Sequence, residues 1–397
     1  MTKILGITNF YSSLDPLCPQ AIQKPAEILS KKGFDIIIFS PTPYASKLMG
    51  KRKYGISKLP SHLILNGIEI YHPHYFEIPK NILKRTAGYR YYYGINKMVS
   101  KKQNTFKPDI IHAHMCFPDG YAAMKFSEKF RMPYIITVRG TDLLTIRKFK
   151  SVKPIMLEIL FKASRVIFPS NRIANQFQEY YSKANISVIP NGIDVNDFDN
   201  LNPLIFPELA HKKIIVSVST LNKDKGIEIN IKALAELVKI HDDIHYIIVG
   251  DGVERNNLNH LVEELNLSSY ITFAGKVDHK KALEYIAFCN VFSLPGWNET
   301  FGLVYLEAMY LKKPIVATFN DGIDGAAKDG VHGFFAHARN IKEVTDALHK
   351  LLSSSELRTE MGLRGHEEVI KGYTWQKHAE EISKVYQQVR NESTKSI

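Results

Sequence analysis

The stretch that decides the fold is Asn290–Val316, which reads NVFSLPGWNETFGLVYLEAMYLKKPIV. It opens with an apolar strand, Val291–Leu294, passes through a Pro-Gly-Trp turn and is predicted to enter a helix near Gly302. Nearly all residues of that helix are uncharged and most are apolar, which predicts a helix that is buried on all sides.

Two carboxylates interrupt this apolar stretch. Glu307 lies inside the predicted helix, and Glu299 lies in the loop before it. A buried carboxylate is costly unless it is paired or hydrogen-bonded, and the free N–H groups at a helix N-terminus favour a phosphate. The pair indicates a polar ligand across the helix N-terminus. The alternative is that Glu299 is a surface acid and that Glu307 pairs with a core Arg or Lys.

The pattern E-T-F-G-L-V-x-L-E-A-M resembles the donor-site motif of retaining glycosyltransferases of the GT-B fold, glycosyltransferase family 4 (group 1). The resemblance implies that Glu299 contacts the hydroxyls of the donor sugar and that Glu307 contacts the nucleotide ribose. It also implies that backbone N–H groups between them hold the sugar and the diphosphate. The residues concerned are Phe301, Gly302, Leu303 and Val304.

The resemblance covers nearly the whole chain. It includes DIIHAH, TVRGTDL and PNGID in the first half, and SVSTLNKDKG, IIVGDG, ITFAGKV, DGVHGFF and YTWQKHAEEISKVY in the second. It implies an α/β protein with two Rossmann-like, doubly wound domains facing a central cleft. We expect an acceptor-binding domain at residues 1–200, a donor-binding domain at 201–375, and a helix at 376–397 that crosses back to the first domain and ends in a flexible tail.

Strands alternate with helices almost throughout, which predicts parallel sheets. In the first half we expect helices at Ala21–Lys32 and Lys80–Lys102, a β region at His62–His72, and strands at Lys3–Thr8, Asp35–Ser40, Asp109–His114, Tyr134–Val138, Arg165–Pro169 and Ser187–Pro190. In the second half we expect strands at Ile214–Ser219, Ile244–Gly250, Ile271–Ala274, Val291–Leu294 and Pro314–Thr318, with helices from Ile341 onward.

Composition indicates the class of protein and its compartment. The 397 residues are 45% hydrophobic and 23% charged, which is ordinary for a globular protein. No apolar run approaches the roughly eighteen residues of a membrane span, and the N-terminus lacks the features of a signal peptide. Cys18, Cys116 and Cys289 are widely separated, which predicts free thiols in a reducing cytoplasm.

Positive charge is concentrated in the first half of the chain. Residues 1–150 carry 24 Lys and Arg against 9 Asp and Glu, whereas the remainder carries 28 against 31. Lys80–Lys102 contains seven cations, no acid and four interleaved tyrosines, and a second basic cluster comprises Lys51, Arg52, Lys53 and Lys58. Cationic, aromatic faces suit anionic lipid. We therefore expect peripheral attachment to the inner membrane face, the alternative being a solvated basic face that binds an acidic soluble acceptor.

Lys225 is the candidate ligand for the diphosphate. It follows a predicted strand in K-D-K-G, where a cation near a helix N-terminus suits phosphate. The family usually has an Arg five residues earlier, where this chain has Thr220, which can donate one hydrogen bond but carries no charge. Lys223 is a candidate for the missing charge, and solvated loop lysines are the alternative.

Two glycine segments are predicted beside the nucleotide. Gly250-Asp251-Gly252 is a lone GxG that does not meet the dinucleotide fingerprint. We interpret it as a tight turn, a purely structural role being the alternative. Gly275-Lys276-Val277 resembles the family segment whose backbone reads the nucleobase, which makes Val277 a donor-site candidate.

His112 and His114 alternate along a predicted strand and therefore share a face. No third metal ligand has a useful spacing, so we expect one to be packed in the core and the other to point to the cleft, with His114 as the catalytic candidate. The family often carries a His where this chain has Arg139, which cannot act as a base but could orient a hydroxyl or bind an acidic acceptor. Asp142 either orients Arg139 or caps the following helix.

These features predict a retaining, metal-independent glycosyltransferase. Asp197 and Asp199 form the only Asp-x-Asp, but they follow a turn in the linker region and are interpreted as capping or solvated. We expect no metal or cofactor, a nucleotide-sugar donor (UDP more than GDP), and a glycan or lipid-linked acceptor in surface polysaccharide or cell-envelope synthesis. The rivals are a nucleotide-sugar epimerase, which would lack the two-Glu motif, and a nucleic-acid-binding protein, for which no recognition motif is present.

Overall fold

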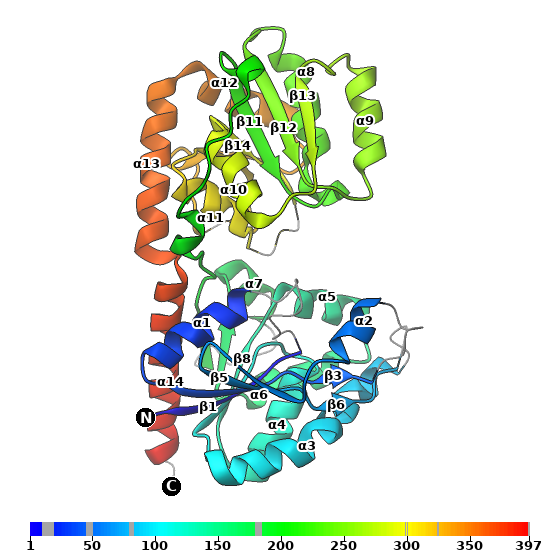
Figure 1. Cartoon of the computed structure of the whole chain (residues 1–397), viewed down its shortest axis with the longest axis vertical. Coiled ribbons are helices and arrows are strands. Elements are labelled where there is room, and N and C mark those ends of the chain that lie inside the picture. The colour runs from blue at the N-terminus through cyan, green and yellow to red at the C-terminus, as the bar shows by residue number, and fades with distance from the viewer. Residues whose placement is uncertain are drawn as a thin grey trace. The chain divides into compact units, whose positions relative to one another are not determined.

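The computed structural model describes residues 1–9, 20–44, 51–78, 83–178, 185–297, 299, 301–323 and 325–395 of the chain. These residues form two compact units (Figure 1). The first unit comprises Met1–Pro190 together with Trp375–Ile397, and the second comprises Asn191–Thr374. Cys18 and Lys80 lie outside the described residues, whereas Cys116 and Cys289 are buried free thiols.

The first unit is built on an eight-stranded sheet with the strand order β10-β9-β8-β7-β1-β2-β5-β4. Every neighbouring pair is parallel except β4 and β5, which form an antiparallel hairpin. The strands are β1 Lys3–Ile7, β2 Asp35–Phe39, β4 His62–Leu65, β5 Ile68–Tyr71, β7 Ile110–Ala113, β8 Tyr134–Thr137, β9 Arg165–Phe168 and β10 Ile186–Val188. The short strands β3 Thr42–Pro43 and β6 His74–Tyr75 pair separately.

Apolar residues on both sides of each strand give this sheet two cores. Ile4 and Ile110 belong to the core on one face, and their neighbours Leu5 and Ile111 belong to the core on the other. The first core also receives α1 Gln20–Lys31 and α14 Trp375–Lys395, which pack against each other. The second receives α3 Ala87–Phe106, α4 Asp119–Phe130 and α6 Lys153–Lys162. The remaining helices are α2 Lys51–Ile56, α5 Gly140–Lys148 and α7 Asn171–Gln176.

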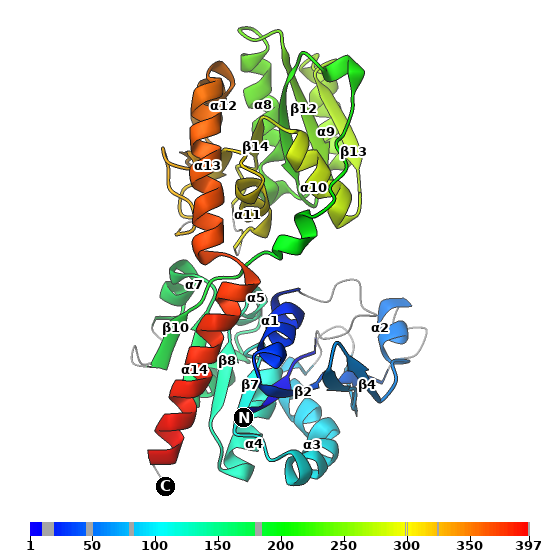
Figure 2. The same ribbon diagram turned by 60° about the vertical axis from the view of Figure 1, so that its left-hand side comes forward.

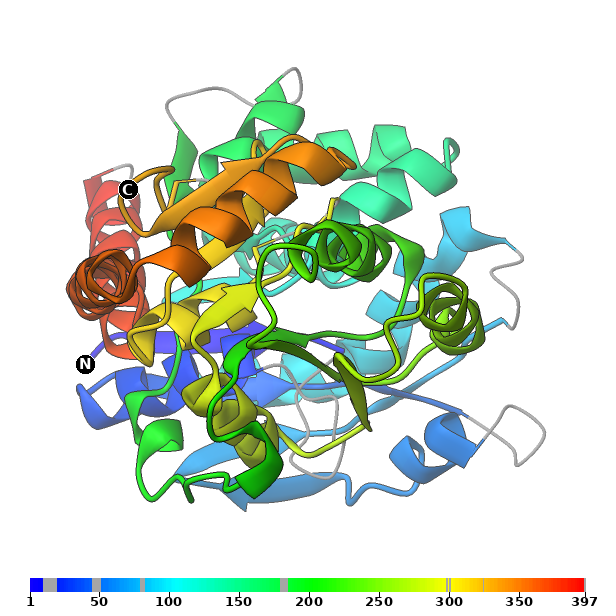
Figure 3. The same ribbon diagram turned by 90° about the horizontal axis from the view of Figure 1, so that it is seen from above.

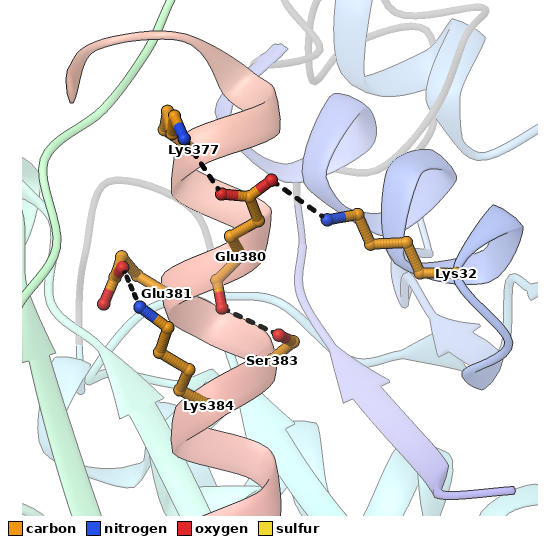
Figure 4. Close-up of polar contacts among 6 residues, drawn as sticks. All are labelled: Lys32, Lys377, Glu380, Glu381, Ser383 and Lys384. Atoms are coloured by element: carbon orange, nitrogen blue, oxygen red, sulfur yellow. Dashed lines mark hydrogen bonds and ion pairs between the residues drawn. The ribbon is translucent and has the colours of Figure 1, made fainter. Parts of the chain in front are cut away.

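Helix α14 lies beside the sheet of the first unit (Figure 2). An apolar face of the helix packs into the core there. Ala379, Ile382 and Tyr386 recur at helical spacing and are at most 3% exposed. Figure 4 shows the polar edge of this helix, where Glu380 bridges Lys377 of α14 and Lys32 after α1, each at 3.3 Å. Exposed ion pairs of this kind contribute about 0–1 kcal/mol, so burial of the apolar face dominates the docking.

The second unit is a doubly wound, all-parallel sheet with the order β13-β12-β11-β14-β15-β16. Its strands are β11 Lys213–Val218, β12 Ile244–Val249, β13 Ile271–Gly275, β14 Val291–Ser293, β15 Ile315–Thr318 and β16 Gly333–Ala336. Its helices are α8 Ile227–Leu237, α9 Arg255–Glu264, α10 His279–Phe288, α11 Leu303–Tyr310, α12 Ile341–Ser353 and α13 Ser355–Gly372. Figure 3 shows α8 and α12 together on one side of the strands, where they are in contact.

The predicted α/β fold class is confirmed, and most predicted strands are correct to within two residues. Three strands were missed: β16, which begins at Gly333, and the two-residue strands β3 and β6. The predicted helix Lys80–Lys102 needs correction, because α3 begins at Ala87, after a 3-10 turn at Lys84–Thr86, and runs on to Phe106. Gly88 and Gly94 lie inside the helix.

Candidate active site

The N-terminus of α11 is formed by Gly302, whose φ of 73° is left-handed. A Cβ at this position would lie 2.6 Å from the ring of Tyr305 and 3.3 Å from Cγ of Glu299. Only glycine therefore allows the chain to turn here while Glu299 packs against it. The turn presents the free N–H groups of the first turn of α11 beside the Glu299 side chain.

Helix α11 is buried on one side only, which corrects the expectation of burial all round. Tyr305, Leu306, Ala308 and Met309 are buried, but Leu303, Glu307 and Tyr310 are partly exposed. These three positions follow the helical repeat and form one stripe. The Glu307 side chain is 14% exposed, and its ion-pair partner is His279 rather than a core Arg or Lys.

Glu299 forms an ion pair with Lys225, although the two residues are 74 positions apart. Lys225 Nζ donates to Glu299 Oε2, and both side chains are about one quarter exposed. The backbone N–H of Glu299 donates to Oδ1 of Asp321 at 2.9 Å, which fixes the loop. The structure thus brings the predicted sugar ligand and the predicted diphosphate ligand together.

Lys225 closes a 3-10 helix, Lys223–Lys225, that follows β11. The carbonyl of Asp224 accepts a hydrogen bond from the backbone N–H of Trp297 at 2.7 Å, so this loop is tied to the loop before α11. Lys223 is exposed, in agreement with a solvated lysine, whereas Lys225 is held at the site. Packing between the two loops therefore places Lys225, and not Lys223, beside Glu299.

His279 was missed by sequence reasoning and contacts Glu307. Its Nε2 lies 2.9 Å from Glu307 Oε1, and its Nδ1 lies 3.8 Å from Asp197 Oδ2. The hydrogen bond to Glu307 raises the pKa of His279, and the nearby charges of Asp197 and Asp278 add to the effect. The sequence V-D-H could have indicated this residue, because an Asp is a common helix cap. Asp278 caps α10 by accepting from the backbone N–H of Lys281, and His279 is the first residue of that helix.

Asp197 and Asp199 belong to a short 3-10 helix, Val195–Phe198. Asp197 lies in its first turn and Asp199 is its C-terminal cap residue, while Asp194 caps the other end by accepting from the backbone N–H of Asn196. Within the described ranges, no cluster of three or more His, Cys, Asp or Glu side chains could hold a metal.

Thr220 and Val277 line one cavity of about 370 Å³ at the carboxyl ends of β11, β12 and β13. Ser219 also lines it, and the buried Oγ of Ser219 has no hydrogen-bond partner among the residues that the structure describes. Gly250 has a φ of 131°, and a Cβ there would lie 1.8 Å from the carbonyl oxygen of Ser219. Gly250 is thus required by the turn itself, whichever ligand the cavity holds.

In the first unit, His112 is the packed histidine of the predicted pair. It is 2% exposed, its Nδ1 lies 2.7 Å from the Tyr386 hydroxyl, and its Nε2 lies 2.8 Å from Oγ1 of Thr137. Burial lowers the pKa of His112 to about 3, and the charge of Arg139 acts in the same direction. The imidazole is therefore neutral at physiological pH.

His114 lies on the same face of the sheet, with its ring 4.2 Å from that of His112. Its Nδ1 is buried and has no partner within the described part of the chain, and burial holds the pKa of His114 well below its usual value. Both histidines line a cavity of about 20 Å³ together with Arg139 and His378, which is room for about one water molecule. A catalytic role for His114 stays a prediction.

Arg139 and Asp142 form the N-terminus of α5. Asp142 is fully buried, and it accepts hydrogen bonds from the backbone N–H of Arg139 at 2.8 Å and of Cys116 at 3.0 Å. Helix capping, one of the two alternatives for Asp142, is thus present. The Arg139 guanidinium is directed elsewhere, because its Nη2 donates to the carbonyl of Ala21 at 3.0 Å.

Each half of the chain matches a model of a known protein family. Residues 22–197 match the glycosyltransferase family 4 model, and residues 205–368 match the model of group 1 glycosyl transferases. The chain is 28% identical over 337 residues to a putative teichuronic acid biosynthesis glycosyltransferase of Bacillus subtilis, covering 81% of this chain and 82% of the relative. It is 23% identical to the alpha-monoglucosyldiacylglycerol synthase of Acholeplasma laidlawii, covering 84% and 86%.

The fold is that of solved GT-B enzymes. The structure of HepE from Anabaena, determined in complex with UDP, superposes with a TM-score of 0.72 at 18% identity and covers 98% of this chain and all of that one. This family assignment argues against both the epimerase and the nucleic-acid-binding alternatives. The chain belongs to the group 1 glycosyltransferases of family 4, and it is an enzyme that transfers a sugar from a nucleotide sugar.

Proposed function

We propose that the enzyme is a retaining, metal-independent glycosyltransferase that transfers a sugar from a UDP-sugar to a glycan or lipid-linked acceptor of the bacterial cell envelope. The observation that carries the proposal is the Lys225–Glu299 ion pair beside the N-terminus of α11. A cation, a carboxylate and free N–H groups at one place match the diphosphate and the hydroxyls of a nucleotide sugar.

Donor binding replaces the ion pair. Lys225 exchanges the carboxylate of Glu299 for the diphosphate, which frees Glu299 to accept hydrogen bonds from the hydroxyls of the sugar. Glu307 accepts from the ribose, and Thr220 and Val277 line the cavity for the remainder of the nucleotide. When Lys225 moves to the diphosphate, the hydroxyls of the sugar replace it as partners of the Glu299 carboxylate, so neither charge is left without a partner.

Transfer proceeds on one face of the sugar. The acceptor oxygen attacks the anomeric carbon as the bond from that carbon to the diphosphate breaks, and the hydroxyl proton passes to the leaving diphosphate. Lys225 and the N–H groups of α11 stabilise the developing negative charge, and preorganised groups of this kind typically contribute about 10²–10³-fold each. His114 and Arg139 are proposed to orient the acceptor hydroxyl, while Asp142 acts indirectly by holding the backbone of Arg139.

The relatives support this choice of substrates. The solved HepE structure contains UDP, and the names of the two relatives refer to teichuronic acid and to a glucosyldiacylglycerol. Thermal unfolding of the purified protein with UDP, GDP, ADP and their sugars tests the donor, because a ligand at 100 times its Kd stabilises by about 2.7 kcal/mol. We expect UDP to give the largest shift. A larger shift with GDP would overturn the UDP assignment.

Attachment to an anionic membrane surface forms part of the proposal. No described helix is both long and apolar enough to cross a bilayer. Leu83, Tyr89 and Tyr93 are 50–68% exposed beside Lys84 and Arg85, which forms an apolar and cationic surface at the start of α3.

Arg90, by contrast, donates to the carbonyl of Phe76 at 3.1 Å and so belongs to the framework of the fold. Co-sedimentation with anionic and neutral vesicles tests the attachment. The Lys84→Ser/Arg85→Ser variant should lose binding, whereas Lys31→Ser/Arg131→Ser, which removes two exposed cations elsewhere on the first unit, should keep it. Equal recovery with both vesicle types would contradict attachment.

A further inference from the structure

The first unit contains a second, larger cavity of about 730 Å³, which we call the α3 groove. It lies between α3 and residues in or next to β3, β4, β5 and β6. Its lining includes Tyr44, His62, Tyr71, His74, Lys97 and Lys101. None of them belongs to the donor or acceptor residues proposed above.

The sequence of α3 creates this groove. Gly94, Lys97, Lys101 and Thr105 are spaced three or four residues apart and line the groove as one stripe of the helix. A Cβ at Gly94 would lie 2.6 Å from Cβ of Tyr75 and 2.8 Å from the carbonyl oxygen of His74. Glycine therefore lets the helix approach β6 closely at this point, and the lysines line the groove beyond it.

Aromatic rings line the opposite wall. The ring of His62 stacks on that of Tyr71 with centroids 4.7 Å apart, and the ring of Tyr44 lies 4.9 Å from that of His74. Tyr44 is 61% exposed. Exposed, rigid rings with a polar edge provide an apolar surface for the C–H face of a sugar ring and hydrogen-bonding groups for its hydroxyls.

The charge of the groove is positive. Lys97 and Lys101 are exposed and form no ion pair with the described residues. The nearby acid is Glu69, which already accepts from Lys102 at 2.8 Å and from the Tyr71 hydroxyl. Two cations without a counter-ion beside stacked rings therefore match a ligand that carries both sugar rings and negative charges.

The groove lies at the β5–β4 edge of the sheet, whereas His114 and Arg139 follow β7 and β8 on the other side of β1. It is thus separated by the width of several strands from the residues proposed to orient the acceptor. A ligand in the groove would not compete with the reacting hydroxyl.

We propose that the α3 groove binds an acidic saccharide, with sugar rings against Tyr44 and His62 and carboxylate or phosphate groups on Lys97 and Lys101. In the enzyme it would hold a part of the acceptor distant from the reacting end, and this role rests on the proposed glycan acceptor. The binding itself does not rest on it, so the two can fail separately.

The test uses tetragalacturonate as the acidic probe and maltotetraose as its neutral counterpart, each titrated calorimetrically into the full-length protein. We expect tetragalacturonate to bind more tightly than maltotetraose and to weaken as salt is raised. Lys97→Ser/Lys101→Ser should weaken it about tenfold, because two charge-assisted contacts are lost. Lys31→Ser/Lys150→Ser removes the same charge from the same unit and should leave the affinity unchanged.

Three results would overturn the proposal: no binding of tetragalacturonate by the wild-type protein, equal weakening by both double variants, or loss of anionic-vesicle binding in Lys97→Ser/Lys101→Ser without any saccharide binding. The last result would assign the groove to lipid. UDP affinity, measured on the same variants, should not change. Loss of saccharide binding with UDP affinity retained therefore reports on the groove, whereas failure of UDP to bind the wild-type protein reports on the proposed function.

Discussion

The polar groups near the candidate sites of the two units differ in burial and in charge. In the second unit the charges are partly exposed and already paired, Lys225 with Glu299 and His279 with Glu307. In the first unit His112 and His378 are buried, and burial lowers their pKa values to about 3 and about 4. Asp119 is fully buried too, and burial holds the pKa of its carboxyl well above the usual range.

The difference indicates what each site can accept. A paired, partly hydrated charge can change partner to a phosphate at little desolvation cost, whereas a buried neutral group resists becoming charged. The second unit is therefore suited to an ionic ligand, and the first to the hydroxyls of an uncharged reacting group.

Removal of the paired cation should have the largest effect. We expect Lys225→Ala to lower kcat/KM by about 10²–10³-fold, because the leaving diphosphate loses its cation. Lys223→Ala removes an exposed lysine of the same loop and should change kcat/KM little. Steady-state kinetics with both variants measures the contrast, and equal losses would show that general positive charge, rather than the Lys225 position, is what matters.

Substitution of Glu299 should mainly affect turnover, and substitution of Glu307 should mainly affect nucleotide binding. We expect Glu299→Gln to lower kcat by about tenfold or more with a small change in donor affinity, since sugar orientation matters most in the transition state. Glu307→Gln should instead raise the Kd for UDP by about tenfold, through loss of a charged hydrogen bond. Calorimetry with UDP and initial-rate kinetics distinguish them; wild-type values for both variants would refute the site assignment.

The free energy of unfolding at low pH should depend on the neutral histidines of the first unit. The pKa of His378, about 4 in the folded state, lies below the unfolded value of about 6.5, so its contribution is complete above pH 6.5 and is lost as pH falls toward 4. His378→Gln retains a donor for the carbonyl of Pro190 and has no proton to gain. Between pH 7 and pH 5 the wild type should lose about 2 kcal/mol relative to this variant.

Urea unfolding of both proteins at the two pH values measures that difference. Comparison with the variant is needed because Asp119 and Asp142 act in the opposite direction: burial raises their pKa values, that of Asp142 to about 6, so they gain protons in the folded state as pH falls. A difference of zero would mean that the pKa of His378 is not lowered in the folded protein.

His279 should have a moderate, pH-dependent effect on nucleotide binding. Its pKa is raised by Glu307, so the protonated contact is complete below about pH 6.5 and is lost as pH rises through the folded pKa. We expect His279→Ala to weaken UDP by about fivefold at pH 6 and to match the wild type more closely at pH 9. If the ratio of the variant Kd for UDP to the wild-type Kd were the same at both pH values, a charged contact would be excluded.

The smallest expected effect is that of a chelator. If Lys225 and the N-terminus of α11 stabilise the diphosphate, dialysis against EDTA should leave the rate of sugar transfer unchanged. Loss of transfer that manganese or magnesium restores would contradict this prediction and would direct attention to Asp197 and Asp199.

Local sequence signals predicted the strands and the position of the two-Glu segment, but not the contacts between distant segments. The motif placed Glu299 and Glu307, yet no pattern in the chain links Glu299 to Lys225, because packing between the loops after β11 and β14 creates that pair. His279 was missed for the same reason. The exposed stripe of α11 was also missed, since Leu303 and Tyr310 are apolar and composition alone assigns them to the core.

The return of α14 to the first unit has a consequence for synthesis on the ribosome. The core that contains Ile4 and Ile110 also requires Ile382 and Tyr386. Residues 375–395 emerge only after the whole second unit has been translated, so the unit that is translated first is the last to complete its core. Until then α14 leaves part of one face of its sheet uncovered beside α1, and nascent chains with exposed apolar surface are the species that chaperones retain. The continuous second unit can fold during that interval.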